Sequence, residues 1–179
     1  MRYKNLKLFA GISLVELLTV LAIIGIVTTI ATPSFVGLIQ KFRAVGEANG
    51  LAGALAVARS EAIRQGAPVT LCISTDGTTC ATNENNWLLG WVIFATPLAA
   101  PDTRVRLRVQ NRWKGTDQLV ATAATSAIVF NRDGFPTGLP AGAVTFQADT
   151  SPPNPAARHC VTLSLTGRRQ VLAHGKGCP

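Results

Sequence analysis

The side chains that most often carry catalysis are few in this sequence. His159 and His174 are its only two imidazoles, and Ser164 stands outside a G-x-S-x-G context. There is no H-E-x-x-H motif and no phosphate-binding glycine loop. We therefore expect no catalytic residue and no cofactor, and we treat a membrane-anchored enzyme as a remote alternative. Both histidines are interpreted as surface residues of a basic hairpin.

The four cysteines are able to form either disulfides or a metal site. Cys72 and Cys80 bracket a predicted turn, whereas Cys160 and Cys178 bracket the last predicted hairpin. Three pairings are possible, of which two local disulfides, Cys72–Cys80 and Cys160–Cys178, are the most economical. Zinc is the alternative, but the chain has no C-x-x-C spacing, and both histidines lie near the second pair only. We expect disulfides, no metal, and an oxidising compartment such as the periplasm or the cell surface.

The net positive charge of the sequence indicates a second kind of function, the binding of an acidic partner. The sequence has 17 Lys and Arg against 9 Asp and Glu, a net charge of +8, which favours nucleic acid or an anionic surface as a partner. Residues 151–179 hold no acid, and their basic residues are Arg158, Arg168, Arg169 and Lys176. Arginines beside a tight turn at Gly167 would present several donors to phosphates, which supply most nucleic-acid affinity.

A rival basic surface lies earlier in the chain, in the segment 103–113. Its residues alternate between basic and apolar, which is typical of a strand. The alternation predicts one face with Arg104, Arg106 and Arg108. The opposite face would carry Val105, Leu107 and Val109.

A single acid stands at the start of a long apolar run. Residues 17–40 are 24 residues without an ionisable side chain, and Glu16 directly precedes them. The run is long enough to span hydrocarbon as a helix. Basic residues in the first eleven positions would keep that end in the cytoplasm. A secretory signal fits poorly, because the run is too long for one and lacks a small-residue cleavage site near its end. An intramembrane acid is costly, so Glu16 needs a partner.

The elements that position these residues follow from hydrophobic periodicity. Apolar residues recur every three or four positions beyond the apolar run, and Gly66 ends the pattern, so we predict one helix from about Ile12 to Gln65. Gly46, Gly50 and Gly53 lower its helicity and permit close packing or a bend.

The period then changes to two, which is typical of strands. We predict strands within residues 67–74, 87–95, 103–113, 127–138, 143–147 and 158–175. Tight turns are expected at Asp133-Gly134 and Thr166-Gly167. Trp87, Trp91 and Trp113 are expected to pack in the core or at sheet edges rather than to stack on bases. The fold class is α+β, with one long helix followed by an antiparallel β-sheet domain.

The N-terminal pattern resembles a known signal. Gly11 followed by Ile-Ser-Leu-Val-Glu is similar to the class III signal of type IV pilins and type II secretion pseudopilins, although Phe and Thr are usual where this chain has Ile12 and Ser13. The resemblance implies that a prepilin peptidase cuts after Gly11 and methylates Ile12. Glu16 would then be the fifth residue of the mature chain and would pair with the terminal amine of a neighbouring subunit. Pro33 falls where pilins commonly carry a helix-kinking proline.

Further segments narrow the resemblance over nearly the whole chain. The segments ALAVARSEAIRQGAPVTLC, GWVIF, IVFNRDGFPTG and CVTLSLTGRR follow one another in the order seen in the GspH/FimT group of minor pilins and pseudopilins. The resemblance implies a type IV pilin fold with residues 1–11 as leader, 12–40 as the membrane or filament-core half of the helix, 41–66 as its amphipathic half and 67–179 as the β-rich domain. It also implies an inner-membrane protein with a periplasmic domain, assembled near a filament tip.

The same resemblance leaves the role of the basic hairpin open. FimT-type minor pilins implicated in DNA uptake carry a G-R-x-R motif there, whereas here Gly167, Arg168 and Arg169 are followed by Gln170. One step along a strand turns a side chain to the other face. The hairpin is therefore either a site for double-stranded DNA without sequence preference or a solvated surface of a structural minor pilin. A pseudopilin of a type II secretion system, with other pseudopilins as partners, is the alternative function.

Overall fold

The computed structural model describes residues 11–98, 103–139 and 142–178, leaving aside the side chains of residues 30–33. The predicted leader therefore lies outside the described residues except for Gly11, and so does the side chain of Pro33. The chain divides into two compact units, residues 1–36 and 37–179, which are described separately below.

The long predicted helix is present. Helix α1 runs from Leu14 to Gln65 and therefore contributes to both units. Gly66 follows it with a φ of +60°, in the left-handed region that glycine adopts without strain, and this residue stops the helix. No single helix among the described residues meets the length and apolarity criteria for crossing a membrane. The segments Leu14–Thr29 and Ser34–Gln65 meet them only when taken as a pair.

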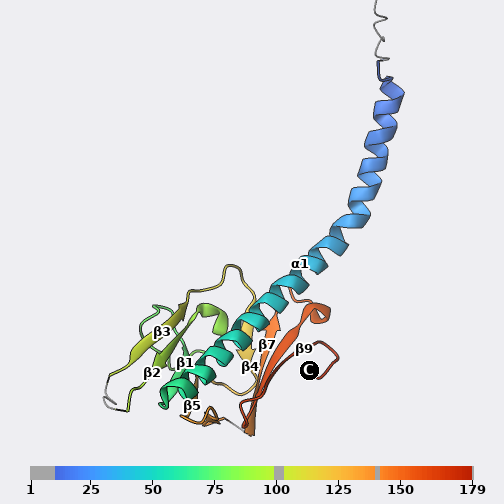
Figure 1. Ribbon diagram of the computed structural model, residues 1–179. Helices are drawn as coiled ribbons and strands as arrows, with labels where there is room; N and C mark the ends of the chain where they lie inside the picture. Colours follow the sequence, from blue (N-terminus) through green and yellow to red (C-terminus); the bar gives the residue numbers. More distant parts are fainter. Residues whose placement is uncertain (1–10, 99–102, 140–141, 179) are drawn as a thin grey trace, which may run out of the picture. The chain divides into compact units, whose positions relative to one another are not determined.

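Two antiparallel sheets follow the helix (Figure 1). The five-stranded sheet has the order β3-β2-β1-β5-β6, and the four-stranded sheet has the order β4-β7-β8-β9. The first sheet consists of β1 (Val69–Ile73), β2 (Trp91–Ala95), β3 (Val105–Gln110), β5 (Ala127–Phe130) and β6 (Pro136–Thr137). The second consists of β4 (Gln118–Ala121), β7 (Ala143–Asp149), β8 (His159–Ser164) and β9 (Arg169–Ala173). Short 3₁₀ turns occupy Trp87–Leu89 (η1) and Pro155–Ala157 (η3).

One hydrophobic core joins the second half of α1 to both sheets. The helix contributes small side chains, including the fully buried Ala44, Ala48, Ala58 and Ala62. Small side chains let the helix lie close to its neighbours, so that larger residues of the sheets fill the space between. Trp87 and Phe146 meet edge to face, with ring centroids 5.3 Å apart. In Figure 1 the cyan and green part of α1 accordingly lies against strands of both sheets.

The α+β class, the antiparallel sheets and the packing role of the tryptophans are confirmed. Trp87 and Trp91 are buried, and Trp113 packs against the core. The single strand predicted over 87–95 is wrong, because residues 87–89 form a 3₁₀ turn and the strand begins only at Trp91. Gly90 separates the two with a φ of +112°, and any Cβ there would lie 2.7 Å from the carbonyl oxygen of Ser74. Strand β4 was not predicted at all, since its four residues carry no long alternation.

Candidate functional site

The proposed cleavage site lies just before the helix. Gly11, Ile12 and Ser13 precede α1, and Ile12 is 77% exposed. The Oγ atom of Ser13 accepts a hydrogen bond from the backbone N–H of Glu16 at 3.3 Å, which caps the first turn of the helix. Glu16 itself is exposed, and no ion pair within the described residues involves it.

The first turns of α1 leave their apolar side chains uncovered. The large apolar side chains from Leu14 to Val27 are each at least 47% exposed. A helix that is apolar all round is stable only when lipid or other apolar helices surround it. Residues 14–27 therefore require an apolar environment that the described part of the chain does not provide.

The basic hairpin is built from β8, β9 and a tight turn. The turn closes through two backbone hydrogen bonds, from Gly167 N–H to Ser164 O at 2.9 Å and from Ser164 N–H to Arg168 O at 3.0 Å. The strands pair so that Arg169 lies opposite Leu163 and Gln170 opposite Thr162. Since paired residues share a face, Arg169 lies on the side of the buried Leu163, and Gln170 lies on the other side.

Gly167 fixes this turn to the helix. Its φ is +72°, and its carbonyl oxygen accepts a hydrogen bond from Nη1 of Arg59 at 2.8 Å. A Cβ at this position would lie 2.8 Å from the carbonyl oxygen of Gly134 and 3.0 Å from Cζ of Arg59. The turn of one sheet, a loop of the other sheet and the helix therefore meet at this glycine.

The basic side chains in and after the hairpin differ in whether a carboxylate pairs with them. Arg168, Arg169 and Lys176 are exposed, and among the described residues none of them takes part in an ion pair. Arg158 instead forms an ion pair with Asp149, with 2.6 Å between Nε and Oδ1. The charge available to a phosphate is thus concentrated on the turn and in the tail.

A disulfide links β8 to the tail that carries Lys176. Cys160 and Cys178 form one bridge, and Cys72 and Cys80 form the other, with Cα–Cα distances of 5.4 Å and 5.5 Å. Within the part of the chain that the structure describes, no group of three or more His, Cys, Asp or Glu is placed to hold a metal ion.

The interpretation of both histidines as surface residues is wrong for one of them. His174 is exposed, but His159 is buried, and its Nδ1 atom lies 2.9 Å from the carbonyl oxygen of Ala157. The reason is that His159 begins β8 and pairs with Ala148 and Ala173, between two neighbouring strands.

The rival basic strand, β3, does not present its arginines on one face. Its pairing with β2 shifts between Ile93 and Phe94, so that Arg108 lies opposite Ile93 and Arg106 opposite Phe94. Ile93 belongs to the main core, whereas Phe94 belongs to a small cluster with Cys72 and Val92. The two arginines therefore lie on opposite faces of the sheet, and the prediction of a single arginine face is wrong because of this bulge.

Both arginines of β3 also contact neighbouring groups. Nη1 of Arg106 donates a hydrogen bond to the carbonyl oxygen of Gly77 at 3.2 Å. The guanidinium carbon of Arg108 lies 6.0 Å from the centre of the Trp91 ring, within reach of a cation–π contact. These arginines are thus tied to their own sheet.

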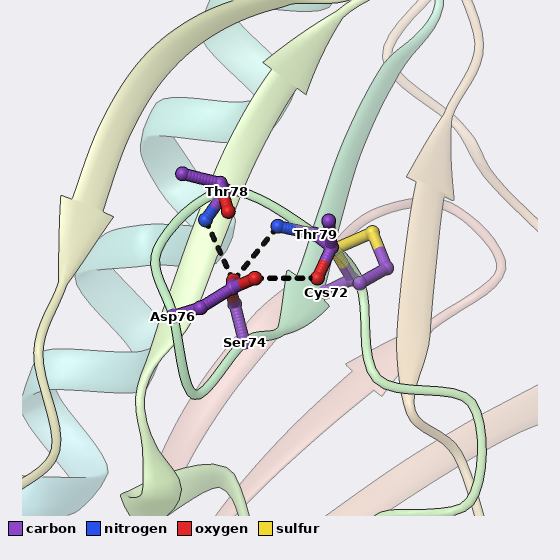
Figure 2. Close-up of a disulfide and its surroundings, with 6 residues drawn as sticks. Cys72, Ser74, Asp76, Thr78 and Thr79 are labelled. Carbon is purple, nitrogen blue, oxygen red and sulfur yellow. Dashed lines mark hydrogen bonds between the residues drawn. A yellow bond between two sulfur atoms is a disulfide. The ribbon is translucent and has the colours of Figure 1, made fainter.

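Gly77 belongs to a loop that the carboxylate of Asp76 organises (Figure 2). Oδ1 of Asp76 accepts hydrogen bonds from the backbone N–H groups of Thr78 and Thr79, both at 2.8 Å. Oδ2 accepts one from the hydroxyl of Thr79 at 2.7 Å. These donors stabilise the ionised form and hold the pKa of Asp76 well below its usual range. Figure 2 shows the loop beside the Cys72 disulfide.

Sequence reasoning missed the residues that join the hairpin to the helix. Arg59 lies within the predicted helix and Gly134 within a predicted turn, and neither was predicted to contact the hairpin. Asp117 and Glu47 were missed as well, since both are isolated acids in sequence and meet only in the folded chain.

Comparison with known proteins places this geometry in a family. The model of the family described as Type II transport protein GspH matches residues 47–167. The chain belongs to the GspH family of minor pilins and pseudopilins. The match covers the last part of α1, the five-stranded sheet and strands β4, β7 and β8, and it ends at Gly167 in the hairpin turn. No curated protein is significantly similar to the chain in sequence.

Solved structures share the fold of this GspH-family protein. The type IV minor pilin FimU of Pseudomonas aeruginosa is 20% identical, with a TM-score of 0.58 over 75% of this chain and 91% of the FimU chain. A second crystal form of FimU gives 21% identity and a TM-score of 0.55 over 72% and 92% of the two chains. The minor pseudopilin EpsH from the Type 2 Secretion System of Vibrio cholerae is 16% identical, with a TM-score of 0.50 over 74% of this chain and 98% of EpsH. The type IV pilin fold is thereby confirmed.

Proposed function

We propose that this chain is a minor type IV pilin that helps to initiate or cap a pilus after removal of residues 1–11. The observation that carries the proposal is an uncovered apolar helix, led by Gly11 and Glu16, on a GspH-family domain. Such a helix is suited first to the inner membrane and then to a filament of similar helices. The partners are other pilins and the prepilin peptidase that cuts before Ile12 and methylates it.

Glu16 supplies a physical reason for ordered assembly. Cleavage after Gly11 creates a positively charged amine one helical turn from this carboxylate. In an apolar environment an unpaired charge is costly, so pairing Glu16 with the amine of a neighbouring subunit stabilises one register between helices. The exposure of Glu16, without an ion pair in the described residues of its own chain, leaves it available for this role.

Two substitutions separate processing from assembly. Glu16→Ala should leave cleavage largely intact but reduce incorporation into filaments, because it removes the acid that pairs with the amine. Gly11→Leu should retain the 11-residue leader, which mass spectrometry of the membrane fraction would detect. Leader removal in the Gly11 variant would contradict the signal, and unchanged filament incorporation of Glu16→Ala would contradict the pairing.

The alternative is a pseudopilin of a type II secretion system. Two observations support it: the family is described as Type II transport protein GspH, and the pseudopilin EpsH shares the fold. Deleting the gene distinguishes the two. Loss of surface pili with normal protein secretion would support the pilus, and the reverse phenotype would support secretion.

We further propose that the basic hairpin binds double-stranded DNA during DNA uptake for natural transformation. The specific observation in favour is the exposure of Arg168, Arg169 and Lys176, which make no ion pair within the described residues. Arg158 is left out of this site because Asp149 already compensates its charge. Contacts to phosphates carry no base information, so binding should be independent of sequence.

The test of DNA binding uses residues 37–179, which contain the whole hydrophobic core. Wild-type protein should shift a DNA duplex at low salt. Arg168→Ala with Arg169→Ala should weaken binding about tenfold and lower the salt slope by roughly two, since each phosphate contact contributes about 0.9. The matched control is Arg106→Ala with Arg108→Ala. Loss of binding only in the control would place the site on β3, and no shift for the wild type would leave a structural minor pilin.

A further inference from the structure

A buried cluster fixes the loop after β3 against α1. The side chain of Asp117 in this loop is only 2% exposed, and its Oδ2 lies 3.1 Å from Nε of Arg43 on the helix. Oδ1 of Asp117 also accepts a hydrogen bond from the backbone N–H of Ser151 at 2.7 Å. Trp113 of the same loop packs on the helix, since a Cβ on Gly50 would lie 2.7 Å from its ring. The loop is therefore held in one position beside α1.

The two acids of this cluster carry no unpaired negative charge. Asp117 forms the ion pair with Arg43. Glu47, one turn further along the helix, is 4% exposed. Burial raises the pKa of Glu47 to about 8, together with the charge of Asp117 and a hydrogen bond between the two carboxyl groups, and Arg43 opposes this rise only in part. Glu47 is therefore mostly protonated and neutral at pH 7.

An open groove of about 400 Å³ lies beside the cluster. Its walls include Ile39 and Phe42 of the helix and Trp113 of the loop. Ile39 is 43% exposed and Phe42 65% exposed. Gly46 lines the groove as well, and a Cβ there would meet no atom within 4 Å. This side of the helix is thus an uncovered apolar slot whose shape is set by the fixed loop.

Basic side chains accompany these apolar walls. Lys114 lines the groove, and Arg112 lines a neighbouring cavity of about 240 Å³ that shares Trp113 and Lys114 with it. Both basic side chains are exposed, and within the described part of the chain neither takes part in an ion pair. Because the acids below are paired or protonated, the groove combines apolar walls with an excess of positive charge.

The groove begins where the long apolar run of the sequence ends. Residues 17–40 hold no ionisable side chain, and Ile39 belongs both to this run and to the groove. Phe42 follows the run by two residues, which is about 3 Å along a helix. In a chain whose apolar run spans a bilayer, this place corresponds to the headgroup region. Tryptophan is enriched at that depth, and basic side chains meet lipid phosphates there.

We propose that this groove binds an anionic phospholipid of the membrane that anchors the protein before assembly. The inference rests on the proposed function, because it requires residues 17–40 to lie in that membrane. The lipid phosphate accepts hydrogen bonds from Lys114 and Arg112. The first part of an acyl chain packs against Phe42 and Trp113. The bound lipid covers the apolar groove and holds the β domain at the membrane surface.

Other occupants match the charge or the walls less well. A zwitterionic lipid brings its own cation toward Lys114 and Arg112, and a basic side chain of another subunit would meet the same two cations. A nucleic-acid phosphate would satisfy the cations but leave Ile39 and Phe42 uncovered. An anionic lipid supplies both a phosphate and a hydrocarbon chain. A neighbouring pilin subunit is the remaining rival, and the experiment distinguishes it.

The test uses the full chain in lipid nanodiscs that contain phospholipids with brominated acyl chains, which quench tryptophan fluorescence on contact. The chain has three tryptophans, and Trp87 and Trp91 are 0% and 3% exposed, so lipid-dependent quenching reports on Trp113. Brominated phosphatidylglycerol should reach half-maximal quenching at a mole fraction about tenfold lower than brominated phosphatidylcholine. Trp113→Phe should remove this quenching.

A pair of double variants tests the cations. Arg112→Ala with Lys114→Ala should raise the mole fraction of brominated phosphatidylglycerol at half-maximal quenching about tenfold, the order expected for the loss of two basic residues at an anionic surface. Both side chains are exposed, so the fold is retained. The matched control is Arg104→Ala with Arg132→Ala, which removes the same charge from exposed positions before β3 and between β5 and β6. The control should quench as the wild type does.

The outcomes separate this inference from the proposed function. Equal quenching by the two brominated lipids would show an apolar contact without a phosphate site and overturn the proposal. An equal loss in both double variants would mean general surface attraction and overturn it as well. A chain that stays in the nanodisc but is quenched by neither lipid would favour a neighbouring subunit as occupant and leave the pilin role intact. A chain that does not enter the nanodisc would contradict the membrane anchor, and with it the proposed function.

Discussion

The two sheets each end in a basic edge strand, β3 in one and β9 in the other, but their arginines are held in different ways. On β3 a bulge sends Arg106 and Arg108 to opposite faces, where a loop carbonyl and a tryptophan ring engage them. On the β9 hairpin the backbone of the turn is fixed by Arg59, whereas Arg168 and Arg169 extend from it. The β9 hairpin, with its fixed turn and its exposed arginines, is suited to binding a partner. The arginines of β3 already contact their own domain and are suited to stabilising it.

The largest expected effect comes from the glycines beside these two edges. Gly167→Ala should destabilise residues 37–179 by about 3 to 4 kcal/mol, since a strained φ and contacts with a backbone carbonyl coincide there. Gly77→Ala should cost only about 1 to 2 kcal/mol, because its Cβ would meet a methyl group of Val109 that is able to move. Urea unfolding followed by tryptophan fluorescence measures both. Equal losses would mean that the β9 turn is no more rigid than the β3 loop.

Removal of either disulfide should cause the next largest loss of stability. Replacing Cys160 and Cys178 by serine opens a bridge with a sequence separation of 18 and should cost about 3 kcal/mol. Replacing Cys72 and Cys80 opens a separation of 8 and should cost about 2.5 kcal/mol. Thermal unfolding of the two double variants in parallel checks the order. A larger loss for the Cys72–Cys80 variant would show that the loop beside β3, rather than chain entropy, sets the cost.

The smallest effect concerns pH and the loop beside β3. The pKa of Asp76 is lowered in the folded state, so its stabilisation is complete above the unfolded value near 4 and is lost progressively as the pH falls below it. Asp76→Asn should therefore be less stable than wild type at pH 7, and the difference should shrink at pH 3. Asp133→Asn, on an exposed turn, is the control. A difference independent of pH would mean that shape, not charge, holds the loop.

The sequence predicts the parts of this molecule that depend on local pattern. The helix to Gln65 follows from periodicity and Gly66, and the hairpin from alternation about Thr166-Gly167. The bulge in β3 was not predictable, because strict alternation in the sequence gives no sign that β2 shifts its register. Strand β4 was missed for a similar reason, since its place is set by pairing with β7.

Some residues of the candidate sites can be predicted from the sequence, and others are brought together only by the fold. Arg168 and Arg169 stand out in sequence because acids are absent around them. Glu47 and Asp117 lie 70 positions apart, and only the packing of α1 against a loop brings the two side chains together. The burial of His159 likewise depends on strands on both sides of β8. Contacts of this kind arise from tertiary structure, which periodicity does not encode.

Both disulfides lie within segments that are short in sequence, and this has a consequence for how the chain folds. Cys72 and Cys80 belong to one sheet and its following loop, and Cys160 and Cys178 to the other sheet and its tail. Each bridge therefore closes without waiting for the other sheet, and no bridge ties the two sheets together. Oxidation should therefore secure the loop after β1 and the tail after β9 independently, and the joining of the two sheets is left to the helix and the shared core.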